Sequence, residues 1–279
     1  MLKILVAGRD GQVGQALVRT ANKRGLELVA LSRQELDITN ASDVELAIAQ
    51  HNPDVVINAA AYTAVDKAEE DREQAHSINT LGPELLAKAC DAVSVPFLHI
   101  STDFVFDGEK ESAYLETDTC NPLGVYGASK LAGENAINQL CPRHIILRTS
   151  WVFGGEQNFV NTMRRLAKDR DHLNVVNDQR GGPTAATQIA EALLIIAEKV
   201  VNPAFDNWGI YHFSGAPAVS WYEFACEILK DVPSVTVTAI PTSQYPTPAK
   251  RPANSVLDCK KIETAFSIKQ PSWKVALTQ

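Results

Sequence analysis

The first half of the chain alternates between short apolar segments and longer segments with helical patterning. The apolar segments are predicted strands, at Leu2–Val6, Glu27–Leu31, Asp54–Asn58, Pro96–Ile100 and His144–Arg148. The segments between them are predicted helices, at about 12–24, 41–50, 70–93 and 126–140. Repeated strand–helix units of this length indicate a parallel sheet with helices on both faces. Ligands bind such sheets at the carboxyl ends of the strands, so the residues that follow each strand are the first candidates for a functional site.

A glycine-rich turn, "GRDGQVG", lies between the first predicted strand and the first predicted helix and contains Gly8, Gly11 and Gly14. One glycine permits the tight turn, one lets the backbone approach a pyrophosphate, and one lets the helix pack close to the sheet. The helix N-terminus, at Gln12 and Val13, offers free N–H groups and a dipole that favour phosphates. The turn therefore predicts a dinucleotide site in a Rossmann-like, doubly wound parallel sheet, with a plain structural turn as the alternative.

The second half of the chain is less regular. Helical patterning recurs near 158–169, 185–200 and 220–230, between Gly/Pro-rich loops. The Pro-rich stretch "PTSQYPTPAKRPANS" (241–255) is either a linker or a functional loop, since long loops in compact domains are often functional. We expect residues 1–150 to form the dinucleotide-binding domain. Residues 151–279 are expected to form mainly a smaller substrate-binding lobe, partly interleaved with the first domain.

The end of the second strand indicates which dinucleotide is bound. A site for NAD usually carries an acid there, but this chain has Ser32 and Arg33. A guanidinium group suits a 2′-phosphate, so Arg33 favours NADPH, with NADH left possible. Alternatively, Arg33 is a solvated surface residue. Asp37 and Ile38 could flank the adenine, and small residues at 59–61 leave room for a ligand, although tight helix packing would also explain them.

A tyrosine and a lysine, Tyr126 and Lys130, stand four residues apart at the start of a predicted helix, so they share one helix face. A free phenol has a pKa near 10, and a neighbouring ammonium group is expected to lower it toward neutrality, where proton transfer is efficient. Ser101 and Thr102, at the end of the fourth strand, supply hydroxyls to hold a substrate oxygen. The combination predicts a proton-transfer site. A surface tyrosine stacked over a lysine stem is the alternative.

Composition narrows the class of protein further. The net charge of −7 argues against a nucleic-acid partner, because phosphate binding favours a basic surface. No apolar run approaches the roughly 20 residues of a membrane span, and the opening segment "MLKILVAGRDG" reads as a strand rather than a signal peptide. The five cysteines are scattered and include no C-x-x-C pair, which is typical of reduced thiols in a cytoplasmic protein.

Seven stretches together resemble the dTDP-4-dehydrorhamnose reductase family, within the extended short-chain dehydrogenases/reductases. They are "GRDGQVG", "PDVVINAAAYTAVDKAE", "STDFVFDG", "NPLGVYGASKLAGE", "RTSWVFG", "NDQRGGPT" and "YPTPAKRPANSVLD". They run from the N-terminus to about residue 258, so the resemblance covers nearly the whole chain. It implies NADPH-dependent reduction of the C4 keto group of a nucleotide-linked 6-deoxy-sugar, with dTDP-4-dehydrorhamnose converted to dTDP-L-rhamnose.

The resemblance also implies roles for single residues. Tyr126 gives a proton to the C4 oxygen, Lys130 lowers the pKa of that tyrosine and binds the nicotinamide ribose, and Thr102 holds the carbonyl oxygen. The implied substrate-binding residues are Thr63, Val65, Thr102, Asp103, Trp151, Arg251 and Asn254. The predicted cofactor-binding residues are Gly8, Gly11, Gln12, Val13, Gly14, Ser32, Arg33, Asp37, Ile38, Ala59, Ala60, Ala61, Tyr126 and Lys130.

Two departures from the family pattern and two alternative functions remain. Some family members dimerise through magnesium held by carboxylates, where this chain has Ala16 and Thr187, so a monomer or a metal-independent homodimer is predicted. After "PSWKVALTQ" the usual closing helix is expected to be missing. Sugar-nucleotide epimerases or dehydratases are an alternative, but dehydratases carry an acid directly after the Thr-Asp pair, where this chain has Phe104. A non-catalytic regulatory subunit of the methionine adenosyltransferase type is the other alternative.

Overall fold

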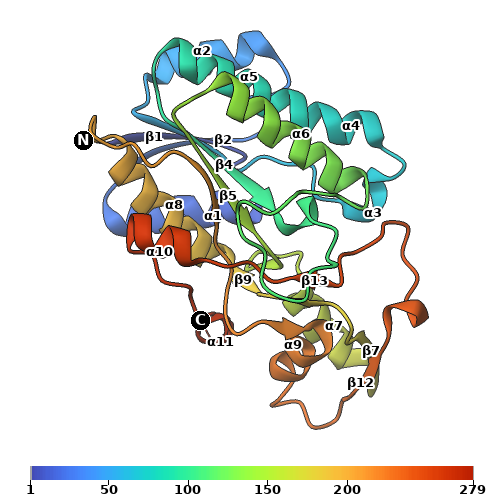
Figure 1. The fold of residues 1–279 in the computed structure, drawn as a ribbon. Helices are drawn as coiled ribbons and strands as arrows, with labels where there is room; N and C mark the ends of the chain where they lie inside the picture. Colours follow the sequence, from blue (N-terminus) through green and yellow to red (C-terminus); the bar gives the residue numbers. More distant parts are fainter. Residues whose placement is uncertain (1, 279) are drawn as a thin grey trace.

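The computed structural model describes residues 2–278 and is built around one six-stranded sheet (Figure 1). Its strand order is β10-β5-β4-β3-β1-β2, and every neighbouring pair is parallel. The strands are β1 (Lys3–Ala7), β2 (Glu27–Leu31), β3 (Val55–Asn58), β4 (Phe97–Thr102), β5 (His144–Thr149) and β10 (Gly209–His212). The five predicted strands are confirmed. The sixth, β10, is a four-residue strand that pairs with β5 from more than 60 residues away in the sequence, and local patterning does not reveal it.

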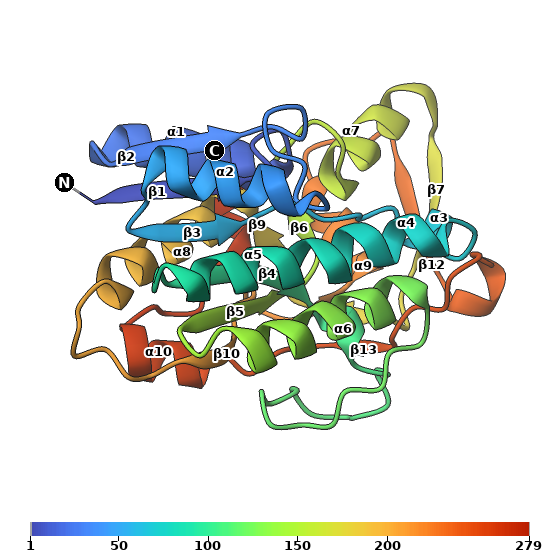
Figure 2. The same cartoon turned by 90° about the horizontal axis from the view of Figure 1, so that it is seen from above.

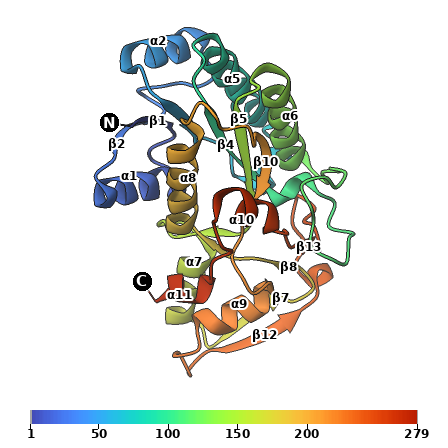
Figure 3. The ribbon, with the colours of Figure 1, turned by 60° about the vertical axis from the view of Figure 1, so that its left-hand side comes forward.

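Helices cover both faces of the sheet, which confirms the doubly wound fold (Figures 2 and 3). One face packs against α1 (Gln12–Arg24), α8 (Ala186–Val200) and α10 (Lys260–Phe266), and the other against α2 (Ala41–His51), α5 (Gly82–Ala92) and α6 (Val125–Leu140). Alternate side chains of a strand point to opposite faces. Accordingly, Ile4 and Val6 belong to the first core layer, and Leu5 and Ala7 to the second.

The helix predicted over 70–93 is divided in the structure. It consists of α4 (Arg72–His76), one π-helical turn at Ser77–Leu81, and α5. Asn79 in the π-helical turn is fully buried, and its side chain bonds to both backbone polar groups of Tyr62 and to the Ser129 hydroxyl. The widened turn thus ties Tyr62, which lies between β3 and the short helix α3 (Val65–Ala68), to α6.

Small sheets and short helices form a lobe beyond the carboxyl edge of the large sheet (Figure 1). Its strands are β6 (Val152–Phe153), β7 (His172–Val176), β8 (Arg180–Gly181), β9 (Thr184–Ala185), β11 (Val219–Ser220), β12 (Thr236–Ile240) and β13 (Asn254–Ser255), and its helices are α7 (Phe159–Asp169), α9 (Trp221–Ile228) and α11 (Trp273–Leu277). Two 3-10 turns lie at Asp103–Val105 and Thr242–Gln244. Three elements from beyond residue 150, α8, β10 and α10, pack with the large sheet instead.

The stretch "PSWKVALTQ" itself contains a short helix, and a closing helix after it would lie outside the described residues. Residues Trp273–Leu277 form the short helix α11, and Trp273 is buried edge-on against Phe224 of α9. Burial of the indole against the lobe accounts for the docking of this helix, since aromatic side chains bury large apolar areas. Among the residues that the structure describes, no helix has both the length and the apolar character of a membrane span.

Candidate active site

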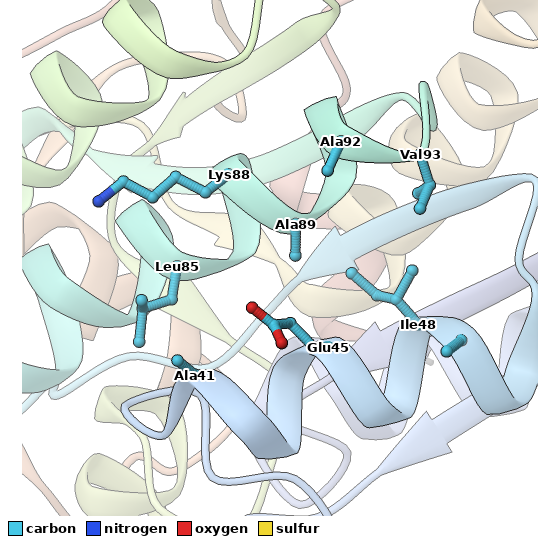
Figure 4. Close-up of a pocket in the computed structure, with 9 residues that line it drawn as sticks. Ala41, Glu45, Ile48, Leu85, Lys88, Ala89, Ala92 and Val93 are labelled. Carbon is cyan, nitrogen blue, oxygen red and sulfur yellow. The ribbon is translucent and has the colours of Figure 1, made fainter.

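A cavity of about 870 Å³ lies between the carboxyl edge of the large sheet and the lobe. Most of the predicted site residues line it: Gly8, Gly11, Gln12, Val13, Arg33, Asp37, Ile38, Ala59, Ala60, Ala61, Thr63, Val65, Thr102, Asp103, Tyr126, Lys130, Trp151 and Arg251. Gly14, Ser32 and Asn254 are not among the lining residues. A smaller hollow of about 240 Å³ lies between α2 and α5 (Figure 4). Of the described residues that line this hollow, Glu45 and Lys88 carry titratable side chains and the rest are apolar, so the large cavity is the candidate site.

The glycine turn has the geometry of a phosphate-binding loop. Gly8 has φ +93°, and a Cβ there would lie 2.5 Å from the Ala60 backbone nitrogen, so only glycine fits. Gly11 is the N-cap of α1 and provides no side-chain cap, and the first turn of α1 carries no acid. The N-terminal N–H groups of α1 therefore fit a phosphate. Gly14 serves packing, since a Cβ there would lie 2.0 Å from the Gly8 carbonyl oxygen.

At the end of β2, Arg33 lines the cavity, whereas the carboxylate of Glu35 is bonded to other residues. Arg33 lines the cavity and forms no ion pair with any residue of the described chain. The Glu35 carboxylate accepts bonds from the Ser32 backbone and hydroxyl, at 2.8 and 2.7 Å, and pairs with Arg9 at 2.9 Å. Ser32 is therefore occupied in holding Glu35. Backbone and side-chain bonds from Thr39 lower the pKa of Asp37, with a smaller contribution from Arg33.

The structure brings Tyr126, Thr102 and Lys130 to the same cavity, at the junction of β4 and α6. The Thr102 hydroxyl donates to Asp103 Oδ1 at 3.0 Å and accepts the Phe104 N–H at 3.2 Å. Burial raises the pKa of Asp103 to about 6. The ring of Phe104 lies edge-on to Tyr126 at 5.5 Å, and a Cβ on Gly127 would collide with the Phe104 carbonyl. These contacts hold the phenol at the carboxyl end of β4.

The predicted lowering of the Tyr126 pKa is wrong for the structure. Burial raises the pKa of Tyr126 to about 12; the Thr102 hydroxyl lowers it and Asp103 raises it. The Lys130 amino group instead donates to the Ile100 carbonyl at 2.8 Å and faces His99 Nε2 at 3.0 Å. Desolvation therefore dominates, because the lysine is directed at β4 rather than at the phenol. Tyr126 is consequently a neutral, protonated phenol throughout the neutral range.

Two stacked indole rings, those of Trp151 and Trp221, line the cavity on the side of the lobe. Trp151 has φ +48°, which is unusual for a bulky residue, and its ring stacks on Trp221 at 3.6 Å and 8°. A Cβ on Gly181 would lie 2.6 Å from the Trp151 ring. Trp221 also lines the cavity, and sequence reasoning missed it. The capping box formed by Ser220 and Glu223 marks the start of α9 in the sequence, but not the direction in which its first residue points.

The Pro-rich loop contributes one of its two predicted residues to the cavity. Arg251 lines it, and its guanidinium pairs with Asp66 of α3 at 2.7 Å. The Asn254 side chain donates to the carbonyls of Lys110 and Ser112, and its oxygen accepts the Val256 N–H. These bonds occupy the polar atoms of Asn254 and tie it to the segment at Lys110 and Ser112.

Comparison with known proteins agrees with this geometry. The sequence profile of the RmlD substrate binding domain matches residues 2–279. The dTDP-4-dehydrorhamnose reductase of Aggregatibacter actinomycetemcomitans is 49% identical over 288 residues, covering 99% of this chain and 97% of that protein. The corresponding protein of Escherichia coli K12 is 39% identical over 288 residues, covering 99% and 96%.

A solved structure shows the same fold at full length. The crystal structure of dTDP-4-dehydrorhamnose reductase from Bacillus anthracis in complex with NADP has a TM-score of 0.93 and 33% identity, covering 100% of this chain and 98% of that one. Both the family profile and these relatives extend over essentially the whole chain. This chain therefore belongs to the dTDP-4-dehydrorhamnose reductase family, which carries the RmlD substrate binding domain.

Proposed function

We propose that this protein reduces the C4 keto group of dTDP-4-dehydrorhamnose with NADPH and forms dTDP-L-rhamnose. The observation that carries the proposal is the convergence of Tyr126, Thr102 and Lys130 with the glycine turn in one cavity. Full-length relatives with the same named activity support it. We also propose that the protein acts in the cytoplasm, as its five free cysteines suggest.

We assign a separate role in the reaction to each of the following groups that line the cavity. The nicotinamide of the bound cofactor supplies the hydride. The α1 N-terminus and Gly8 would hold its diphosphate, and Lys130 its ribose. Thr102 orients the substrate carbonyl, and Tyr126, kept protonated by its raised pKa, gives the carbonyl oxygen its proton. Phe104 packs against Tyr126 at the position where a dehydratase would need an acid, which favours simple reduction.

The substrate's diphosphate is assigned to Arg251. Guanidinium groups bind phosphate oxygens through charge-assisted hydrogen bonds. Arg251 is paired with Asp66, whose other carboxylate oxygen accepts the Ala249 N–H at 3.2 Å. A diphosphate that binds Arg251 must therefore compete with Asp66, and the loop at 249–251 is tied to α3 through the same carboxylate.

Turnover by the isolated chain tests the proposal. NADPH oxidation should be followed with dTDP-4-keto-6-deoxy-L-mannose and with its UDP- and GDP-linked analogues. The proposal requires oxidation of NADPH and formation of dTDP-L-rhamnose with the dTDP sugar. Water loss or epimerisation in place of reduction would favour the other sugar-nucleotide enzymes, and a chain that binds NADPH without turnover would favour a regulatory subunit.

Cofactor preference should depend on Arg33. A charge-assisted bond to a 2′-phosphate contributes about 1.5–3 kcal/mol, and exposure at the cavity rim places it at the low end because salt screens it. We expect NADPH to bind about tenfold more tightly than NADH, since 1.4 kcal/mol corresponds to a factor of ten. Arg33→Ala should weaken NADPH binding and spare NADH binding. Dissociation constants for both cofactors at two salt concentrations check this, and an equal loss of both would show that Arg33 is only a surface charge.

Activity should not depend on a divalent metal. Ala16 is fully buried in the core layer shared by α1 and α8, and Thr187 carries no carboxylate, whereas magnesium prefers charged oxygen ligands. Residues 2–278 also contain no cluster of three His, Cys, Asp or Glu side chains suited to a metal ion. We expect EDTA to change neither turnover nor sedimentation behaviour, in keeping with a monomer or a metal-independent homodimer. Loss of either property, restored by magnesium, would contradict this.

A further inference from the structure

A buried row of side chains, Asn58–His99–Lys130, runs beneath the floor of the cavity. Asn58 on β3 and His99 on β4 are fully buried, and Lys130 on α6 is nearly so. The Asn58 amide nitrogen lies 3.1 Å from His99 Nδ1, and His99 Nε2 lies 3.0 Å from Lys130 Nζ. Neither Asn58 nor His99 has a part in the proposed reaction. The row nevertheless ends at Lys130, which does have a part in that reaction.

The orientation of Asn58, the first residue of the row, determines where the hydrogens of the row lie. The Ala60 backbone N–H donates to Asn58 Oδ1 at 3.0 Å, which orients the amide so that its NH₂ faces His99. His99 Nδ1 must then accept a hydrogen bond. A neutral imidazole carries one N–H, so it is placed on Nε2 and points at Lys130. The His99 ring is neutral because burial, assisted by Lys130 and His144, holds its pKa well below the usual range.

An ammonium group has three N–H donors and no lone pair, so it cannot accept the hydrogen of His99 Nε2. A neutral amine can accept it, while one of its own N–H groups donates to the Ile100 carbonyl. We propose that His99 is a positioning residue for Lys130: the Asn58–His99 pair directs the lysine amino group toward β4 and favours its neutral amine form. The inference deepens the proposed reductase function and rests on its assignment of Lys130 to the site.

The charges around Lys130 are consistent with this arrangement. Burial lowers the pKa of Lys130 to about 8, and Glu134, one turn further along α6, opposes that shift. Glu134 is itself bound by Arg148 of β5 at 2.6 Å, which compensates its charge. Among the described residues, the other titratable groups that act near the row are His144 on β5, which lowers the pKa of His99, and Asp103, which raises the pKa of Tyr126.

Nuclear magnetic resonance measures the tautomer of His99 and the protonation of Lys130 directly, without catalytic turnover. In protein with ¹⁵N-labelled histidine and lysine side chains and no added cofactor, His99 should show the Nε2–H tautomer. The Lys130 Nζ signal, identified by its loss in Lys130→Met, should titrate with a midpoint at or below about 8. An Nδ1–H tautomer of His99, or a Lys130 midpoint at the ordinary lysine value, would overturn the proposal, whereas failure of the proposed function would leave both signals as expected.

A variant tests the same contact through the pH profile. In His99→Gln the amide oxygen is free to turn toward an ammonium group, so the Lys130 midpoint should rise by about one to two pH units, the size of one charge-assisted hydrogen bond. The alkaline limb of NADPH binding should move up by the same amount. His144→Gln is the matched control, because this buried histidine bonds the Cys141 carbonyl, whereas the Lys130 amino group bonds the Ile100 carbonyl and faces His99. A shift in the control, or none in His99→Gln, would show a merely structural role.

Discussion

Replacing Tyr126 with phenylalanine is expected to lower kcat by about 10²–10⁴, the range that general acid catalysis contributes. The Tyr126 side chain is half-buried at the cavity, and its raised pKa of about 12 keeps the phenol protonated, which is the state that a proton donor requires. Phenylalanine preserves the ring that lies 5.5 Å from Phe104 and removes only the hydroxyl. The fold and NADPH binding should therefore be nearly unchanged. Steady-state kinetics and the NADPH dissociation constant measure the two effects separately.

Tyr62→Phe is a suitable control for this substitution. Tyr62 packs in the same apolar cluster as Tyr126, but its hydroxyl bonds to Asp71 at 3.1 Å and it does not line the cavity. The control should retain wild-type kinetics. If Tyr126→Phe kept its activity within about threefold of wild type, the loss would be far too small for the removal of a general acid. The assignment of the proton donor would then have to be abandoned.

Replacing Arg148 with methionine is expected to lower the free energy of unfolding by about 3–5 kcal/mol, because breaking a buried ion pair leaves an uncompensated charge. The side chains of Arg148 and Glu134 are only 2% and 1% exposed. Three bonds of 2.6–3.2 Å join them, and the guanidinium also stacks over Phe106 at 5.1 Å. The pair links β5 to α6, the helix that carries Tyr126 and Lys130. Urea-induced unfolding measures the loss.

Two further variants separate charge from packing. The double variant Arg148→Met with Glu134→Leu removes both charges, and it should recover most of the lost stability, since apolar replacement of a whole buried pair is often neutral. The exposed pair Arg180–Glu223 is the surface control, and breaking it should cost about 1 kcal/mol or less. A loss from Arg148→Met no larger than that of the surface control would mean that the buried pair does not stabilise the fold.

Much of the fold could be predicted because its signals are local. Apolar runs of five residues predicted β1 to β5, and the glycine spacing predicted the turn into α1, where Gly8 has a backbone conformation that suits glycine. Local patterning did not reveal β10, since its pairing with β5 depends on residues far away in the sequence. It also missed the π-helical turn before α5, which coincides with the buried contacts of Asn79 to segments on either side.

The sequence by itself determined the fold class, the edge of the sheet at which the large cavity lies, and the residue types gathered there. The tertiary structure alone decided that Trp221 supports Trp151, that the Asn254 amide is bonded to the carbonyl of Lys110, and that the Lys130 amino group faces His99. It also reversed the predicted shift of the Tyr126 pKa. The physical reason is that a pKa depends on burial and on the direction of neighbouring charges, and both arise only when β4, α6 and the lobe pack around the same side chain.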